Sequence, residues 1–438
     1  MTDLFKLSGD IVDSGAADVT VNRITQELSE LGDGLAVVES FSHSVVFDTG
    51  EGLVVFDTSG ANTGEAVVEA IRGWRQDPLH SVVYTHGHLD HVGGSGAFLR
   101  DALDKGGPAA RPRFIGHERV IDRIHRYRMT GGYNNVINQR QFVGMQRHGY
   151  GIGLKKRHFI PHEVVEPDVT YRQKSAFRAG ELTFELHHAL GETDDHTWGW
   201  IPERRIICAG DFFIWNFPNC GNPQKVQRYP KEWAQALRDM AAMNPEVFIP
   251  AHGLPISGAE RIRRVLDEVA GVLEYLVDET LEMMNDGAPL NDIIHSVRVD
   301  PDLLEKPWLR PFYDEPEFIV NNLWRYYGGW YGGEPDRLKP ARVSALGQEY
   351  CRLLGGAGAL IARAQELSDA GEHRLACHLI ETAVQGEPDN LEAHDARARI
   401  YTARRSQETS MMAKGIYAWA ANESKEKSGQ AGGEGEAS

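Results

Sequence analysis

The sequence is poor in cysteine and has no long apolar segment, and both shortages narrow the class of protein. Only 4 cysteines occur among 438 residues, and none forms a Cys-x-x-Cys pair, which argues against a disulfide framework or a cysteine-ligated metal. No run of about eighteen apolar residues is present, so no membrane span is expected. The first residues lack a basic segment followed by an apolar run, so no secretion signal is expected. These features predict a cytoplasmic protein.

Positive charge is also scarce. The chain has 46 Lys and Arg against 63 Asp and Glu, for a net charge of -17 at pH 7, and no basic patch stands out. Binding to nucleic acid depends on neutralising phosphates with Lys and Arg, so a nucleic-acid partner is not expected. The length allows a large core and predicts two or three domains.

What the sequence does have is a dense histidine cluster. Residues 85–93 read Thr-His-Gly-His-Leu-Asp-His-Val-Gly, which places His86, His88, Asp90 and His91 within six positions. A β-branched and aromatic run at 81–84 precedes the cluster and predicts a buried strand. The four side chains are therefore expected to fan out from the loop that follows this strand. Because imidazole suits zinc, iron or copper and carboxylate tolerates most of these metals, the loop predicts a metal site.

This loop resembles the His-x-His-x-Asp-His signature of the metallo-β-lactamase-fold hydrolases, and three later segments match the same family in order. Residues 187–199 contain a His-Thr-x-Gly element, 205–211 form an apolar strand ending in Gly-Asp, and 247–253 form a strand ending in histidine. The resemblance assigns His86, His88 and His196 to one metal, Asp90, His91 and His252 to a second metal, and Asp211 to a position between them.

The resemblance implies a dinuclear site with two zinc ions per chain, and iron and manganese are the alternatives because they occupy related sites. In such a site a water shared between two cations loses its proton near neutral pH and becomes a nucleophile. Asp90 is expected to orient this hydroxide and to pass its proton to the leaving group, which requires only hydrogen-bond reach. The sequence therefore predicts a hydrolase.

The first 260 residues fit the α/β fold of this family. Residues 35–41 are strand-like, and 44–47 with 53–58 predict a hairpin at the edge of a sheet. Residues 61–76 have helical periodicity. Strands and helices continue to alternate around Phe114, Phe184 and Ile206. We therefore expect an αββα metallo-β-lactamase sandwich, with the helices outside and the metals at one edge.

Two segments are candidates for the substrate pocket. Residues 124–167 are too long for a plain connection, and their centre at 130–142 carries Asn135 and Arg140, which are expected to contact an anionic or polar substrate; a solvated loop is the alternative. Arg228, in the Asn/Gly/Pro-rich stretch 216–230, is a further candidate anion contact. Aromatic residues near the site suggest a small-molecule substrate with an apolar portion; they are Trp198, Trp200, Phe212, Phe213, Trp215 and Phe217.

The second half of the chain resembles the zinc-dependent alkylsulfatases. Residues 311–331 look like the segment that joins the catalytic and dimerisation domains of those enzymes. From about residue 344 apolar residues recur at helical spacing, and Gly371 and Pro388 divide the region into helical hairpins of tetratricopeptide type. The resemblance implies an all-α dimerisation domain and a homodimer; a helical cap on its own catalytic domain is the alternative.

These observations predict four regions. They are a metallo-β-lactamase-like catalytic domain at 1–265, a helical extension and linker segment at 266–343, a helical dimerisation domain at 344–422 and a disordered tail at 423–438. The tail is rich in Gly, Ser, Glu and Lys, a composition that buries too little apolar surface to fold.

The bond that is hydrolysed has several candidates. The domain architecture favours an alkyl sulfate ester. Alkylsulfatases generally carry glutamates where this chain has His196 and Asp211, so the ligands favour the alternative, which is hydrolysis of a carboxylic ester, lactone, thioester or amide. A non-catalytic helical interaction protein with a structural metal centre is a third interpretation, disfavoured because a structural zinc rarely needs an open dinuclear site.

Overall fold

A computed structural model describes residues 2–142 and 159–429 of the chain. These residues divide into two compact units: the first holds 2–134 and 159–329, and the second holds 135–142 and 330–429. In the part of the chain that is described, no helix is long and apolar enough to cross a lipid bilayer.

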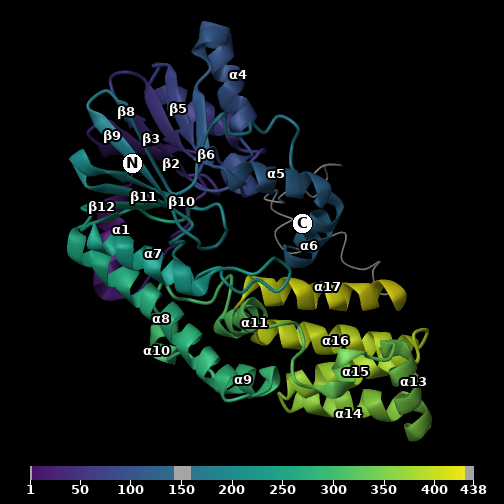
Figure 1. The fold of residues 1–438 in the computed structure, drawn as a ribbon. Helices are drawn as coiled ribbons and strands as arrows, with labels where there is room; N and C mark the ends of the chain where they lie inside the picture. The colour runs from purple at the N-terminus through teal and green to yellow at the C-terminus, as the bar shows by residue number, and fades with distance from the viewer. Residues whose placement is uncertain (1, 143–158, 430–438) are drawn as a thin grey trace. The chain divides into compact units, whose positions relative to one another are not determined.

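The first unit is built on two β-sheets (Figure 1). One sheet has seven strands in the order β1 to β7, antiparallel from β1 to β4 and parallel from β4 to β7. Its strands are β1 (Leu28–Gly32), β2 (Leu35–Val38), β3 (Ser44–Asp48), β4 (Leu53–Phe56), β5 (Leu79–Val83), β6 (Arg113–His117) and β7 (Val169–Tyr171).

The other sheet has six strands in the order β13-β12-β11-β10-β9-β8. Its neighbours are antiparallel except for the parallel pair β11 and β12. Its strands are β8 (Lys174–Ala179), β9 (Leu182–His188), β10 (Thr197–Ile201), β11 (Ile206–Gly210), β12 (Val247–Pro250) and β13 (Ile256–Ser257).

Side chains from both sheets meet in one apolar layer. Val45 and Phe47 of β3 belong to the same buried cluster as Phe184 of β9 and Cys208 of β11, and the rings of Phe47 and Phe184 lie 5.3 Å apart between centroids. Alternate residues of β11 enter a second cluster on the opposite face of that sheet, as expected for a strand that is buried on both sides. The predicted αββα sandwich is therefore confirmed.

The predicted hairpin is present, but its predicted place in the sheet is wrong. β3 and β4 pair in antiparallel fashion with Val46 opposite Val55. β2 then pairs with the free side of β3, and β5 pairs with the free side of β4. All four residues of β4 are buried, so the hairpin lies in the interior of the sheet, where a run without polar alternation belongs.

Helices of the first unit cover the sheets. α1, α7, α8 and α11 contribute to the buried cluster on the outer face of the six-stranded sheet, and α2 packs against α4 on the other sheet's side and contacts β1 and β2. The helices are α1 (Leu4–Ser14), α2 (Gly64–Trp74), α3 (Leu89–Val92), α4 (Ser95–Gly106), α5 (Arg119–Met129), α7 (Pro230–Ala242), α8 (Ala259–Asn285), α9 (Leu290–Ser296), α10 (Pro301–Leu304) and α11 (Pro316–Tyr327), with short 3-10 turns at Pro108–Ala110 and Pro202–Arg204.

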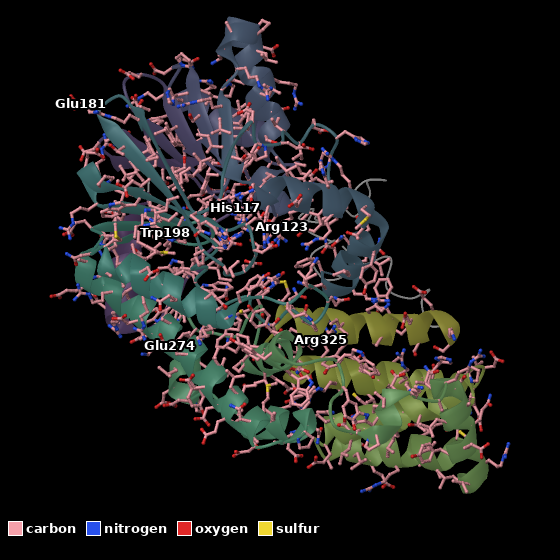
Figure 2. The ribbon with its side chains drawn as sticks, viewed as in Figure 1. His117, Arg123, Glu181, Trp198, Glu274 and Arg325 are labelled. Carbon is pink, nitrogen blue, oxygen red and sulfur yellow. The ribbon has the colours of Figure 1, made fainter. Side chains whose placement is uncertain are left out.

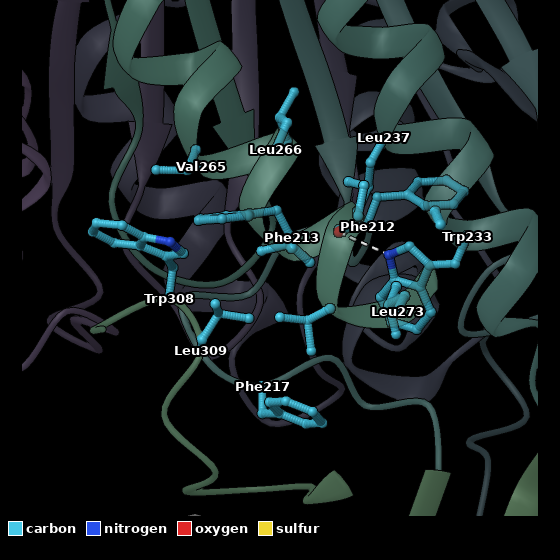
Figure 3. Packing of buried hydrophobic residues seen from close by; sticks show 14 of the residues in the cluster. Phe212, Phe213, Phe217, Trp233, Leu237, Val265, Leu266, Leu273, Trp308 and Leu309 are labelled. Atoms are coloured by element: carbon cyan, nitrogen blue, oxygen red, sulfur yellow. Dashed lines mark hydrogen bonds between the residues drawn. The ribbon is translucent and has the colours of Figure 1, made fainter. Parts of the chain in front are cut away.

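The outer cluster is rich in aromatic side chains (Figure 3). The indole Nε1–H of Trp233 donates to the carbonyl oxygen of Phe212 at 2.9 Å, and that of Trp215 donates to Leu254 O at 2.8 Å, so these large side chains are buried without an unmet donor. All six aromatic residues that the sequence suggested as an apolar surface near the substrate lie in this core; they are Trp198, Trp200, Phe212, Phe213, Trp215 and Phe217.

The predicted domain boundary at residue 265 falls inside α8, a continuous helix of 27 residues. Ile262, Val265 and Leu266 on the early part of this helix and Leu273 further along are fully buried in the same core. The first compact unit accordingly continues past α11.

The second unit is helical. Its core is made of small and apolar side chains of α13 to α17, and consecutive helices from α14 to α17 pack on one another, while α13 packs on α15. Gly347 and Gly386 let α13 and α15 approach closely, because a Cβ on Gly347 would lie 2.6 Å from Gly386 N. The helices are α12 (Pro335–Leu338), α13 (Val343–Leu354), α14 (Gly358–Asp369), α15 (His373–Gly386), α16 (Leu391–Gln407) and α17 (Met411–Lys427).

The breaks between these helices fall where the sequence predicted them, at Gly371 and Pro388. The helix α17 continues past the predicted start of the tail at residue 423 and ends at Lys427. The remaining helix, α6 (Gly131–Gln141), occupies the centre of the predicted insertion, so that stretch is helical rather than a solvated loop. The later part of the insertion, 143–158, lies outside the described residues.

Candidate metal centre

The candidate ligands come together because several strands end at the same edge of the sandwich. β5 ends two residues before Thr85, β11 ends immediately before Asp211, and β12 ends two residues before His252. Gly210, at φ 56°, makes the turn out of β11. A Cβ at this position would lie 2.7 Å from Nε2 of His196 and 2.8 Å from Cβ of Thr85, so the close approach of the loops requires glycine here.

The first group of ligand atoms contains His86, His88, Glu192 and Asp211, each offering one atom within 4.8 Å of the others. His86 Nε2 lies 2.8 Å from His88 Nδ1 and 3.8 Å from Asp211 Oδ2. Glu192 Oε1 lies 3.6 Å from His88 Nδ1. Two imidazoles and two carboxylates therefore face one point.

The second group contains Asp90, His91 and His252. His252 Nε2 lies 3.4 Å from Asp90 Oδ2 and 3.4 Å from Asp211 Oδ1, and His91 Nε2 lies 3.4 Å from Asp211 Oδ2. Asp211 therefore reaches ligand atoms of both groups, which is the position that the resemblance assigned to it. All the predicted ligands except His196 are brought together in these two groups.

The donor set fits metal ions. Among the described residues, three buried atoms in these groups have no hydrogen bond: His91 Nε2, Asp211 Oδ1 and Glu192 Oε2. Burial holds the pKa of His86 and that of His88 well below the usual value, so both imidazoles are neutral and have a lone pair to offer. Burial would raise the pKa of Asp211, but the charges of His91 and His252 outweigh it and hold that pKa well below its usual range.

Asp57 orients the metal loop, residues 85–93, through contacts with Thr85 and His91. Its Oδ2 lies 2.8 Å from Nδ1 of His91, while its Oδ1 accepts the backbone N–H of Thr85 at 2.7 Å and its Oδ2 accepts the Thr85 hydroxyl at 2.7 Å. A carboxylate on the far nitrogen of a histidine fixes the ring's tautomer and orientation, leaving Nε2 for a metal. The sequence motif did not reveal Asp57, which lies 34 residues before His91.

The buried ion pair of Asp195 and Arg123 also holds the metal loop in place. The Asp195 carboxylate accepts the backbone N–H of Gly87 at 2.9 Å and Nε–H of Arg123 at 2.9 Å. Arg123 also contacts Asp194, which pairs with Arg119 at 3.1 Å. Figure 2 labels Arg123, which comes from α5. Because Asp195 contacts the peptide between His86 and His88, it fixes the spacing of these two ligands.

His196 is placed differently from the other predicted ligands. Its Nε2 accepts the backbone N–H of Asp211 at 3.1 Å, its ring stacks on Phe212 with 4.1 Å between centroids, and burial lowers its pKa to about 3. It belongs to neither ligand group. Glu192, four residues earlier in the same loop, lies with His86 and His88 instead, and sequence reasoning missed it.

The cation Arg228 supports Glu192. Its Nη1 contacts Glu192 Oε1 and donates to Asn219 O at 2.6 Å, and Asn219 Nδ2 donates to Glu192 Oε1 at 2.5 Å. Burial, only partly offset by Arg228, raises the pKa of Glu192 to about 8. Burial followed by the charge of Arg228 lowers the pKa of nearby Lys225 to about 8. The predicted role of Arg228 as a substrate contact stays a prediction.

Asn135 and Arg140 both lie in α6, and both belong to the second compact unit. The backbone oxygen of Arg140 lies close to Gly415 of α17, where a Cβ would come within 2.7 Å of it. Contact of Asn135 and Arg140 with substrate therefore also stays a prediction.

The chain matches two family models. Residues 37–252 match the Metallo-beta-lactamase superfamily, and residues 289–427 match the Alkyl sulfatase dimerisation family. The first match begins in β2 and ends at the candidate ligand His252, and the second begins just before α9 and ends with α17.

Four curated relatives are named as alkylsulfatases or as an alkyl/aryl-sulfatase. The chain is similar to a linear primary-alkylsulfatase of Pseudomonas sp., at 26% identity over 80% of this chain and 68% of the relative. It is also similar to the alkyl/aryl-sulfatase BDS1 of Saccharomyces cerevisiae, at 25% identity over 82% of this chain and 56% of the relative. The chain thus spans between 56% and 68% of the length of these relatives.

Among solved structures, the stereoselective inverting sec-alkylsulfatase Pisa1 from Pseudomonas sp. is similar in fold. It has a TM-score of 0.78 at 21% identity, with 92% of this chain and 66% of that chain covered. The chain therefore has a metallo-β-lactamase domain followed by an alkylsulfatase dimerisation domain, and the likeness to Pisa1 shows that the fold is shared.

Proposed function

We propose that the chain is a metal-dependent hydrolase that acts on an alkyl sulfate ester. The observation that carries this proposal is the pair of ligand groups that share Asp211, in a chain with an alkylsulfatase dimerisation domain. The names of the curated relatives, among them an (R)-specific secondary-alkylsulfatase of Pseudomonas sp. at 25% identity over 82% of this chain, support the same substrate class.

We propose two zinc ions as the cofactors. His86, His88 and Glu192 would hold one ion, Asp90, His91 and His252 the other, and Asp211 would contact both. When bound, such a pair supplies Lewis-acid activation of the ester and lowers the pKa of water. Zinc is the expected metal because imidazole and carboxylate donors suit it, with iron or manganese as alternatives.

Side chains of the protein supply proton transfer and hold the ligands in position. Asp90 is partly exposed, with its Oδ2 3.4 Å from His252 Nε2 and 3.7 Å from His91 Nε2, so its carboxylate has access both to the ligand group and to the outside. In this proposal Asp90 would hold a proton and pass it to a leaving alcohol. Asp57 and Asp195 keep the ligand loop in position through His91 and Gly87.

Glu192 affects the choice between a sulfate ester and an acyl compound as the substrate. The acyl-ester alternative depended on a ligand set in which His196 and Asp211 stand where alkylsulfatases generally have glutamates. Since Glu192 joins the first group and His196 does not, the group contains the additional carboxylate after all. The ligands therefore no longer favour an acyl substrate over a sulfate ester.

The test combines metal content with a substrate panel on freshly purified protein: a medium-chain alkyl sulfate and its matched carboxylic ester, lactone and thioester. We expect about two metal ions per chain and sulfate release that a chelator abolishes. Turnover of acyl substrates alone would refute the sulfate assignment, and metal binding without any turnover would favour the interaction-protein interpretation.

We also propose that the chain forms a homodimer through α13. One side of this helix, with Gly347 and Cys351, is buried against the second unit's own core. The other side exposes large apolar residues at helical spacing; they are Val343, Leu346, Tyr350, Leu353 and Leu354, from 46% to 79% exposed. An exposed apolar stripe of this kind marks an interaction site, and the dimerisation family match includes it.

A further inference from the structure

A cavity opens beside Glu192 within the first unit, with a volume of about 310 Å³. Its wall comes from α5, from the loop after β9, from the segment before α7 and from α11. The residues that matter for recognition are Arg123, Arg126, Glu192, Tyr229, Arg325 and Tyr326. Figure 2 labels Arg123 and Arg325, which enter from the separate helices α5 and α11.

One side chain, Glu192, belongs both to the wall of the cavity and to the candidate metal centre. Glu192 lines the cavity and also belongs to the first ligand group, with Oε1 3.6 Å from His88 Nδ1. A ligand that fills the cavity therefore extends to the wall of the metal centre. The cavity is thus placed to hold the part of a substrate that lies away from the reacting ester.

The charges around the cavity are not balanced. Arg123 is paired with Asp194 and Asp195, and Glu192 is paired with Arg228. Among the described residues, no carboxylate lies within ion-pair distance of Arg126 or Arg325, although every other charged side chain of the wall is paired. Two guanidinium groups therefore remain for a ligand, in a chain whose net charge is -17.

Two tyrosine rings and one valine adjoin these cations. The rings of Tyr229 and Tyr326 meet edge to face with 5.6 Å between centroids, and Val226, which also lines the cavity, is 55% exposed. Such a surface suits a short carbon chain. A chain ending in a methyl group would form no ion pair with either guanidinium group, whereas a terminal carboxylate, sulfate or phosphate would meet their planar donors.

We propose that the preferred substrate carries a second anionic group at the end of its carbon chain remote from the ester, and that Arg126 and Arg325 bind this group. The proposal rests on the proposed function and narrows its substrate class to anionic, bifunctional esters. Arg126 and Arg325 are specificity residues here, because they act on the remote group and leave the reacting bond to the metal centre.

The experiment compares octyl sulfate with its ω-carboxylated counterpart, and octanesulfonate with its own ω-carboxylated counterpart as non-hydrolysable ligands. Turnover is measured with the sulfates and binding with the sulfonates by calorimetry, on the protein as purified. We expect the carboxylate to lower KM and Kd by about tenfold, near the lower end of what a charge-assisted hydrogen bond supplies, with kcat unchanged.

Arg126→Gln and Arg325→Gln should each remove most of this preference and leave KM and Kd for the methyl-terminated compounds unchanged. Arg128→Gln is the matched control, because Arg128 lies on α5 but pairs with Glu166 at 2.5 Å and does not line the cavity. The control variant should keep the full preference for the carboxylated compounds.

The two proposals fail in different ways. If octyl sulfate is hydrolysed but the carboxylated compounds are not preferred, or are still fully preferred by both the Arg126→Gln and the Arg325→Gln variant, the cavity assignment is refuted and the proposed function stands. If neither sulfate is hydrolysed but the carboxylated sulfonate binds more tightly through Arg126 and Arg325, the cavity assignment stands and the proposed reaction does not.

Discussion

Glu192 and His196 lie four residues apart in one loop, and their hydrogen-bond partners give them different roles. The lone pair on Nε2 of His196 is occupied by the Asp211 backbone N–H at 3.1 Å, which places the peptide of Asp211. Glu192 keeps one oxygen free of hydrogen bonds among the described residues, while Asn219 and Arg228 hold the other. A metal ligand needs a free lone pair, and Glu192 has one on Oε2 while its Oε1 lies 3.6 Å from His88 Nδ1.

Glu192→Gln and His196→Gln therefore should differ in metal content. Glu192→Gln replaces a carboxyl group that can lose its proton to a metal by an amide that cannot, so we expect the bound metal to fall from about two ions per chain toward one. His196→Gln should keep both ions and lose thermal stability instead. Metal analysis after dialysis measures this difference. Equal metal loss in the two variants would mean that His196 is a metal ligand.

His43 makes the protein sensitive to acid. Burial, followed by the charge of His252, lowers its pKa to about 4 from a usual 6.5, and its Nε2 lies 2.8 Å from Gly253 O. Between these values the unfolded chain binds a proton that the folded chain does not, so stability falls as pH decreases from 7 to 5. This one group should cost about 2 kcal/mol over that range.

His43→Gln keeps an N–H donor for Gly253 O and removes the titration. Denaturant unfolding at pH 7 and pH 5 should show a smaller loss of stability in the variant than in the unmodified chain. Metal release is common to both proteins, so the difference between them isolates His43. Identical losses would mean that His43 is already protonated, or accessible to protons, in the folded state.

The sequence revealed those site residues that lie close together in the chain. His86, His88, Asp90 and His91 were found because their spacing has no ordinary packing explanation. Asp211 and His252 were found because the resemblance to the metallo-β-lactamase-fold hydrolases places ligands at the ends of these two apolar strands. Glu192, Asp57 and Asp195 were missed because they are single acidic residues in loops, whose partners are set by the folded backbone. The loop that ends at His196 contains three acidic residues, Glu192, Asp194 and Asp195, and the sequence does not distinguish Glu192 from the other two.

At the scale of elements, the metal loop is a short segment clamped between buried acidic groups. Asp195 joins the loop to α5 through Gly87 and Arg123, and a side chain at Gly87 would come within 2.9 Å of the Asp195 carboxylate. The loop itself has only one turn of helix, α3, and so cannot hold its own shape by backbone hydrogen bonds alone.

Asp195→Asn should loosen this loop. Arg123 would keep only the partly exposed Asp194 as a carboxylate partner, and removing one partner of a buried ion pair costs about 3 kcal/mol or more. We expect a fall in melting temperature of about 5 °C or more and weaker retention of metal. Asp194→Asn is the matched control and should have a smaller effect on both, which scanning calorimetry and metal analysis would show.

The elements themselves were predictable where their pattern is local. Residues 44–47 and 53–58 show the hairpin, and 61–76 show the helix that the structure places at Gly64–Trp74. The place of this hairpin within the sheet was not predictable, because strand order depends on pairing with strands that are distant in sequence. The helix α6 was missed because Gly131 and Gly132 suggest a loop, whereas Asn134 closes its first turn with hydrogen bonds to Thr130.

At the scale of the whole molecule, two independently built units are joined in one chain. The first has the sandwich core and the ligand groups, and the second has a helical core of its own made largely of alanine and isoleucine. The first unit holds all seven ligand candidates of the two groups, so assembly and metal binding can be changed separately.

Leu353→Glu should therefore split a dimer without damaging the metal centre. Leu353 is 79% exposed on α13, so the substitution costs the isolated chain little, while in a dimer it would bury a charge against an apolar surface. We expect sedimentation to show dimers for the unmodified chain and monomers for the variant, with unchanged metal content. Glu349→Gln is the matched control, because Glu349 lies on the same helix and is exposed and paired with Arg352. If the unmodified chain is a monomer at all concentrations, or the variant stays a dimer, α13 is not the interface.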